Sequence, residues 1–261
     1  MNQKYIIHNY LVLEAETSLE FKKKLIANIS NSEIKNGGFD LKKYLSQKIN
    51  SFVTTAKGKG NKVIFDEAAS NAIQEKVEHN LEKAMQVLDN SNVVHVYLIP
   101  TLNQFLKEYM DGIQGWCPSK NAIHLYIHPD CNKNIALIET LVHEYNHTVF
   151  RSYHLWNKVE EGLVAEGLAE HFRLELVGGK RAKWTEVLNE KESMFWLEKI
   201  KPVLKSESFE DYNNVFTNFD EEPYPLWTGY TVGYYLIEKY RKINKSVWNE
   251  IMKVEIEIIT G

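Results

Sequence analysis

The chain of 261 residues carries 31 lysines and arginines against 35 aspartates and glutamates, which gives a formal net charge of −4. Hydrophobic residues at 44% and charged residues at 25% are ordinary globular proportions, so they exclude a disordered or collagen-like chain. The mildly acidic balance argues against a protein that binds nucleic acid, because phosphate backbones attract basic surfaces. Two cysteines cannot form a disulfide scaffold and favour a reducing compartment.

The sequence shows no segment that we expect to export the chain or insert it into a membrane. Polar side chains interrupt residues 1–13, so this stretch lacks the apolar core of a signal peptide. No run of about 18 apolar residues occurs, which argues against a membrane span. We therefore expect a cytoplasmic protein without a membrane partner, and the sequence leaves the oligomeric state open.

The first half of the chain mixes helical and extended patterns. Its N-terminal part is expected to be helical with lysine-rich faces, for example over 19–29, and the glycine- and lysine-rich residues 57–62 indicate an exposed turn rather than a phosphate-binding loop. Apolar residues at steps of three and four then predict an amphipathic helix over 68–89. A β-rich run over 93–99, closed by Pro100, predicts a buried strand.

A second strand is expected from Ala122 to His128, where Pro129 stops it. Apolar side chains alternate there with polar or aromatic ones, which is typical of a strand covered on one face only. The apolar set is Ile123, Leu125 and Ile127, and the other set is His124, Tyr126 and His128.

Beyond residue 133 the periodicity is helical almost to the end of the chain. We expect helices over 134–150, 158–177, 181–199 and 226–243, with Gly178-Gly179 ending the second. This order predicts an α+β fold, in which an α/β part with a small sheet (1–130) precedes a mainly helical part (131–261). A cleft between the two parts is the expected place for a site.

The helix expected over 134–150 contains His143-Glu144-Tyr145-Asn146-His147, an H-E-x-x-H motif. Two histidines four residues apart lie one above the other on a helix and can bind one metal ion. Glu144 follows the first histidine, where it can contact a metal-activated water as the general base of a zinc metallopeptidase. The alternative is a pair of solvent-facing histidines on a surface helix.

A catalytic zinc needs a third protein ligand, and two histidines with one glutamate form a standard set. The next helix carries Glu166, with 18 residues (148–165) between it and His147, and Glu170 follows one turn later. Gly167 and Ala169 are small, as we expect where two helices approach closely. We expect Glu166 to be the third ligand, whereas Glu170 either accepts the free ring N–H of a ligating histidine or is a solvated charge.

These motifs resemble those of the gluzincins, the thermolysin-like zinc metallopeptidases, and the Glu166 block is similar to that of the aminopeptidase N group. The G-x-M-E-N motif of that group has no match, so its specificity for peptide N-termini is not implied. The chain more closely resembles the bacterial YjaZ-like family of predicted zinc-dependent proteases. That resemblance covers roughly 93–241 and rests on the H-E-x-x-H motif with Arg151 after it, the block 166–170 and the segment 227–234. It implies a gluzincin-like fold and Zn²⁺-dependent hydrolysis of a peptide or protein substrate.

The resemblance also suggests where the substrate binds. In gluzincin-like folds the strand nearest the zinc lies at a sheet edge and pairs with extended peptide. By analogy we expect the backbone of 122–127 to bind substrate, with an interior strand as the alternative. The residues concerned include Ala122, Ile123, His124, Leu125 and Tyr126.

A hydrogen-bond donor for the oxyanion is expected on the helix over 226–243. Tyr230 and Tyr234 are four apart there, and Gly229 and Gly233 beside them let this helix approach others closely. Tyr230 is the first choice because it is nearer the helix start, with Tyr234 and His171 in reserve. The alternative is that both tyrosine rings are core aromatics.

Together these residues predict a zinc metallopeptidase that hydrolyses peptide bonds by a metal-activated water with Glu144 as general base. The alternative is a non-catalytic, metal-stabilised binding or regulatory protein that retains the site. A set of two histidines and one glutamate leaves a coordination position open, whereas structural zinc sites are closed by four protein ligands. This difference and the presence of Glu144 favour the enzyme.

Overall fold

The computed structural model describes residues 4–12, 18–28, 65–131, 134–220 and 222–261. Contacts divide the chain into two compact units, the first formed by Met1–Gln86 and Asn90–Thr148, the second by Val87–Asp89 and Val149–Gly261. The turn expected over 57–62 and the last residue of the helix expected over 19–29 lie outside the described residues. The division expected at residue 130 stays a prediction.

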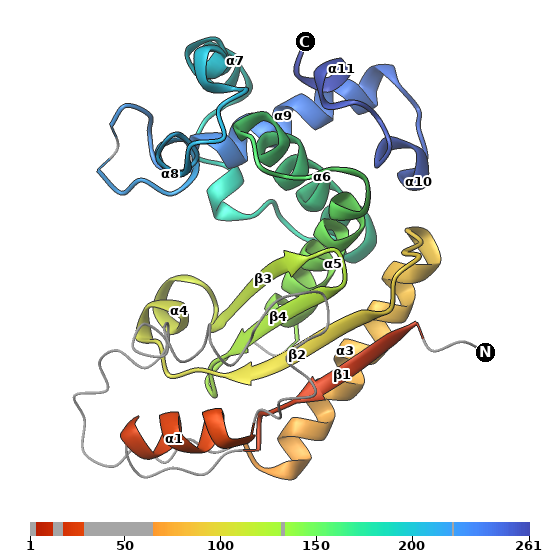
Figure 1. The fold of residues 1–261 in the computed structure, drawn as a ribbon, viewed down its shortest axis with the longest axis vertical. Coiled ribbons are helices and arrows are strands. Elements are labelled where there is room, and N and C mark those ends of the chain that lie inside the picture. Colours follow the sequence, from red (N-terminus) through yellow and green to blue (C-terminus); the bar gives the residue numbers. More distant parts are fainter. Residues whose placement is uncertain (1–3, 13–17, 29–64, 132–133, 221) are drawn as a thin grey trace. The chain divides into compact units, whose positions relative to one another are not determined.

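The first unit contains a four-stranded sheet with the order β1-β2-β4-β3 (Figure 1). The strands β1 (Tyr5–Asn9), β2 (Val94–Pro100) and β4 (Ala122–Ile127) are parallel neighbours, and β3 (Ile113–Ser119) runs antiparallel to β4. The buried strand expected over 93–99 is confirmed as β2. The strands β1 and β3 were not expected from the sequence.

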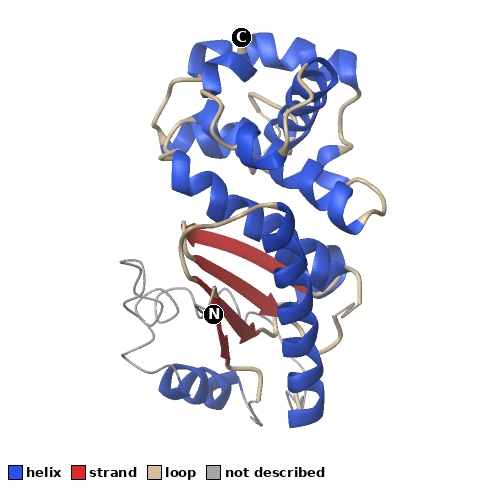
Figure 2. Cartoon of the chain, turned by 90° about the vertical axis from the view of Figure 1, so that its right-hand side faces the viewer, coloured by secondary structure: helices blue, strands red, loops and turns tan. Residues whose placement is uncertain are grey.

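A long helix, α3 (Glu67–Val87), runs along one face of this sheet (Figure 2). Its buried side chains recur at the steps of three and four that predicted it. The strand β1 turns two polar side chains towards it, because Asn9 donates to Gln74 at 3.0 Å and the Tyr5 hydroxyl donates to Glu82 at 2.8 Å. The unit also contains α1 (Ser18–Asn28) and α4 (Gln104–Tyr109), and α5 (Ala136–Tyr153) begins in it.

The expectation that residues 122–128 are covered on one face only is wrong. Every residue of β4 is buried, because the strand lies between β2 and β3. The side chain of His124, which was expected to face solvent, packs among aromatic rings. His124 Nδ1 lies 3.2 Å from Tyr126 Oη, and the His124 ring meets Tyr97 and Trp116 edge to face. Burial lowers the pKa of His124 to about 3, so the imidazole is neutral.

The second unit is helical. The helices expected over 158–177 and 226–243 are confirmed as α6 (Val159–Val177) and α9 (Thr228–Ile243), and Gly178 ends α6 at a φ of 81°. The helix expected over 181–199 is wrong in its first half, because Asn189 caps a shorter helix by accepting from Glu192 N. The remaining elements are η2 (Lys183–Thr185), α7 (Glu190–Ile200), η3 (Lys201–Val203), α8 (Phe209–Phe216), α10 (Trp248–Ile251) and α11 (Ile256–Thr260).

The helices α6 and α9 pack backbone against backbone. A Cβ atom added at Gly233 would lie 3.0 Å from the carbonyl carbon of Leu163, and one added at Gly167 would lie 2.7 Å from Ile237 Cγ1. The close approach expected from the small residues on both helices is confirmed within this unit. Over the whole described chain, no helix combines the length and apolar character that a bilayer span requires.

Candidate metal centre

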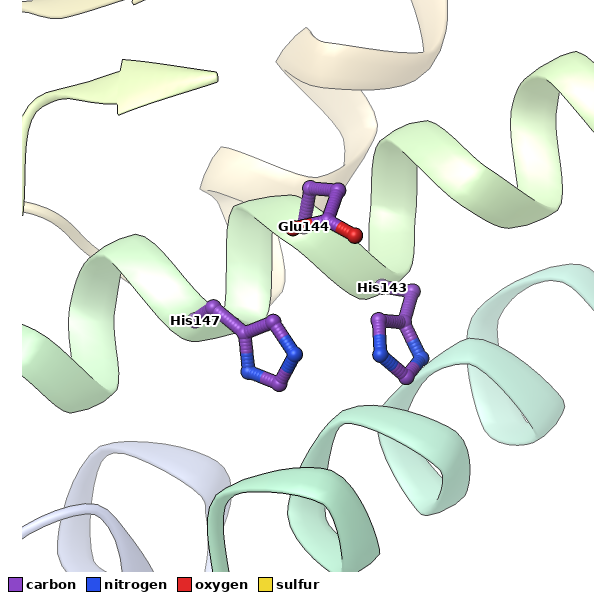
Figure 3. Close-up of side chains that lie close together, drawn as sticks. All are labelled: His143, Glu144 and His147. Carbon is purple, nitrogen blue, oxygen red and sulfur yellow. The ribbon is translucent and has the colours of Figure 1, made fainter. Parts of the chain in front are cut away.

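Three potential metal ligands lie close together on α5. One ring nitrogen of His143, one of His147 and one carboxylate oxygen of Glu144 lie within 4.8 Å of one another. Both imidazole rings project from the same side of the helix (Figure 3), with centroids 4.6 Å apart and planes at 88°. The spacing of four residues produces this geometry, since it places the two side chains one turn apart on one face. In the described part of the chain, no other group of this kind occurs.

The donor set of this cluster fits a zinc ion. Imidazole nitrogens and carboxylate oxygens bind zinc at about 2.0–2.2 Å, so small side-chain rotations bring both rings to one ion. His147 is 3% exposed, Glu144 8% exposed and His143 partly buried. The residues present therefore suit the ion that the sequence predicted.

The carboxylate of Glu144 also lies against β3. A Cβ atom added at Gly115 of this strand would stand 2.5 Å from Glu144 Oε1 and 2.7 Å from its Cδ. Residues 114–116 are partly exposed, so the carboxylate lies beside an accessible stretch of strand. Sequence analysis missed Gly115, although a glycine inside a strand is a known signal of close approach by another group.

The substrate strand expected at 122–127 is wrong. The backbone of β4 is paired with β2 on one side and with β3 on the other, so Ala122, Ile123, His124, Leu125 and Tyr126 cannot receive a further strand. Among the described strands, β3 is the edge strand next to β4. Pro118 of β3 fits this place, because proline lacks the N–H that an interior strand needs.

Glu166 lies on α6 of the second unit and is 9% exposed. One turn earlier, Gly162 makes room for a phenol, since an added Cβ would lie 3.0 Å from Tyr212 Oη. The indole N–H of Trp156 donates to this oxygen at 3.3 Å. Burial and then the charge of Glu166 raise the pKa of Tyr212, so the phenol stays protonated beside the carboxylate. Sequence analysis missed both aromatic residues, which belong to no motif.

Glu170 is part of a buried ion pair. The Nη2 of Arg173 donates to its Oε1 at 2.5 Å and Nε to its Oε2 at 3.3 Å, and Ala182 N donates to Oε1 at 2.7 Å. Arg173 also donates to the carbonyl groups of Gly178 and Lys180. Oε1 of Glu170 thus ties α6 to the segment that follows it, and Arg173 does the same through the two carbonyl groups. The contact of Glu170 with a histidine ligand stays a prediction.

The three candidate oxyanion donors have different surroundings within the second unit. The ring of Tyr234 stacks on His171 at 4.4 Å, and the Arg181 guanidinium lies 3.7 Å over it. His171 Nε2 is 3.0 Å from the Tyr234 carbonyl oxygen. Tyr230 is partly exposed and meets Phe216 edge to face at 5.2 Å. The two reserve residues contact one another, and the choice of Tyr230 as the donor stays a prediction.

Comparison with known proteins identifies the family of the chain. The chain is similar to "Uncharacterized protein YjfC" of Bacillus subtilis (strain 168), with 25% identity over 175 residues. That match covers 61% of this chain and only 56% of the relative, so the chain spans little more than half of the relative's length. No solved structure matches the chain significantly. A family model matches residues 73–260, which include the H-E-x-x-H motif and Glu166, and the chain therefore belongs to the family described as "Predicted Zn-dependent protease (DUF2268)".

Proposed function

We propose that this protein is a zinc metallopeptidase of gluzincin type that hydrolyses peptide bonds. The proposal rests on one observation above all, the approach of His143, Glu144 and His147 to within 4.8 Å on a single helix. Membership of a family described as predicted zinc-dependent proteases supports it. In this proposal His143, His147 and Glu166 hold the ion, and three protein ligands leave one position for water or substrate.

The side chains divide the work between binding and proton transfer. Zinc, when bound, supplies Lewis acidity, which lowers the pKa of water to about 7 and polarises the substrate carbonyl. His143 and His147 bind as neutral rings, whereas Glu144 stays outside the ligand set. Its carboxylate accepts a proton from the attacking water and returns it to the leaving amine. The Tyr230 hydroxyl is proposed to donate to the oxyanion, for which it must come within about 3 Å.

The edge strand β3 is the proposed place for the substrate. An edge strand can take up an extended peptide as a further strand, with main-chain hydrogen bonds that do not depend on peptide sequence. The partly exposed residues 114–116 of β3 include Gly115, which lies against Glu144. A peptide bound along this stretch would therefore place a carbonyl group near the proposed base.

A Glu144→Gln variant tests the proposed function. Glutamine keeps the shape of the side chain but cannot accept the proton, so cleavage of unfolded casein or of a quenched peptide library should fall by about 100- to 10,000-fold. Zinc binding should persist, because Glu144 is not a ligand in this proposal. The matched control is Glu75→Gln, an exposed substitution on α3 of the same unit, which should leave cleavage unchanged. Full activity of the Glu144→Gln variant would overturn the assignment of Glu144 as general base. In a separate test, a chelator should abolish cleavage by the wild type.

The third ligand needs its own measurement. Glu166→Gln should weaken zinc binding, measured by competition with a chromophoric chelator, because an amide oxygen is a poorer zinc ligand than a carboxylate. The Glu75→Gln control should bind zinc as the wild type does. Equal affinity in all three proteins would assign the third ligand to another residue.

A further inference from the structure

The place of Gly115 in β3 calls for a physical explanation. Glycine weakens a strand interior, since it gives up more conformational freedom than alanine on folding and offers no side chain for packing. A positive φ explains many other glycines, such as Gly112 in the turn before β3, where φ is 79°. Gly115 is not among the residues with positive φ, so its backbone conformation is open to any amino acid. The reason for glycine at this position is therefore space.

The space is taken by the side chain of Glu144. The three atoms nearest to a Cβ added at Gly115 all belong to Glu144. Each would lie less than 3.0 Å from the Cβ, which is closer than non-bonded atoms approach in folded proteins. The strand alternates its faces, so Gly115 and its partner Leu125 point to the face opposite that of Trp116 and His124. Along α5, the same carboxylate has an oxygen within 4.8 Å of a nitrogen on each histidine ring.

We infer that Gly115 is a positioning residue, whose missing side chain lets the Glu144 carboxylate lie beside His143 and His147. This inference rests on the proposed function of Glu144 as general base. A methyl group at position 115 would occupy the place of the carboxylate. The glutamate side chain is flexible, so it would turn away while the backbone of β3 and α5 stays in place. The substitution should therefore disable the base without unfolding the protein or removing the metal.

The decisive variant is Gly115→Ala in the full chain. If the base is displaced, kcat for casein cleavage should fall by about 100-fold or more, which is the scale of losing a general base. The dissociation constant for zinc should stay within about twofold of wild type, because both histidines keep their rotamers, and KM should change little. Wild-type kcat in Gly115→Ala would overturn the inference.

The Glu144→Gln background separates an effect through the base from an effect on the substrate strand. With the base already absent, Gly115→Ala should cause no further loss of the residual turnover. An equal loss in both backgrounds, or a rise in KM, would mean that the new methyl group disturbs peptide binding at β3, and would also overturn the inference.

Thermal unfolding of the metal-free protein gives a readout that does not depend on catalysis. Alanine is favoured over glycine in a strand. Gly115→Ala should therefore raise Tm in a Glu144→Ala background, where the glutamate side chain no longer fills the space beside position 115. In the wild-type background, where Glu144 fills this space, the same substitution should not raise Tm. Additive Tm changes would show that the two side chains do not compete for space and would refute the inference. If the wild type cleaves nothing while the Tm changes are coupled, the contact stands and the proposed function fails.

Discussion

Replacing Gly233 with alanine should destabilise the helical unit, although the same change stabilises most helices. In a helix interior alanine is favoured over glycine by about 0.5–1 kcal/mol. At Gly233 the added Cβ would lie 3.0 Å from the carbonyl carbon of Leu163 and 3.3 Å from its Cα, and closer still to the carbonyl oxygen. These are backbone atoms of α6, which cannot rotate away as a side chain can. The two helices must move apart instead.

The expected size of this effect follows from the contact. Overpacking a well-packed interface costs about 1–3 kcal/mol, and a backbone partner places Gly233→Ala at the upper end. After the gain in helix propensity, we expect a net loss of about 2 kcal/mol in the free energy of unfolding. Urea unfolding followed by circular dichroism measures this loss directly.

Gly229→Ala, one turn earlier on α9, provides the matched comparison. Its Cβ would meet ring atoms of Phe216 at 2.7 to 2.9 Å, and a ring can turn where a backbone carbonyl cannot. The loss should therefore be smaller than for Gly233→Ala. If Gly233→Ala equals or exceeds the wild type in stability, α6 and α9 are not packed backbone to backbone, and the reasoning is refuted.

Three further predictions concern individual side chains. Glu170→Gln should lower the free energy of unfolding in urea by about 3–5 kcal/mol, because it leaves the buried Arg173 without its counter-charge. The zinc bound per chain should not change. A loss below about 1 kcal/mol would contradict the buried ion pair. The pKa of His124 is about 3 in the folded chain and about 6.5 in the unfolded chain, so the unfolded state takes up the proton first as the pH falls. The contribution of the neutral ring to stability is therefore complete above about pH 6.5 and is lost as the pH decreases towards 3. Urea unfolding at several pH values should show that the free energy of unfolding decreases less steeply with falling pH in His124→Phe than in the wild type. The control His79→Phe, at an exposed site, should behave as the wild type does. Equal pH dependence in all three proteins would count against a buried neutral ring. Tyr230→Phe should lower casein turnover by about ten- to a thousandfold with little change in zinc affinity, and unchanged turnover would leave Tyr230 as a packing residue only.

The features that sequence analysis predicted correctly are those with local causes. The helices α3, α6 and α9 each extend over at least four turns, so their three-and-four periodicity or their flanking glycines mark them within the chain itself. The proximity of His143 and His147 has the same local origin, because a helix alone brings residues four apart onto one face.

Several features that were missed depend on contacts between residues on different strands or helices, which no local pattern records. The register places His8 beside Tyr97, Tyr97 beside His124, and His124 beside Trp116, so four rings form a row across all four strands. In sequence His124 looks like a solvent-facing polar residue, whereas in the fold it is buried on the central strand β4 beside Tyr97, Trp116 and Tyr126. Gly115 is a similar case, because its meaning depends on Glu144, which is remote in sequence and touches it only after folding.

A zinc titration of cleavage activity tests the central claim most directly. Protein stripped with a chelator is given increasing equivalents of zinc, and both the bound zinc and the release of casein fragments are measured. The proposed function predicts no cleavage without metal and a rise in activity proportional to bound zinc, with a plateau at one ion per chain. Cleavage by the metal-free protein, or no cleavage of casein and of a peptide library at one bound zinc per chain, would contradict it.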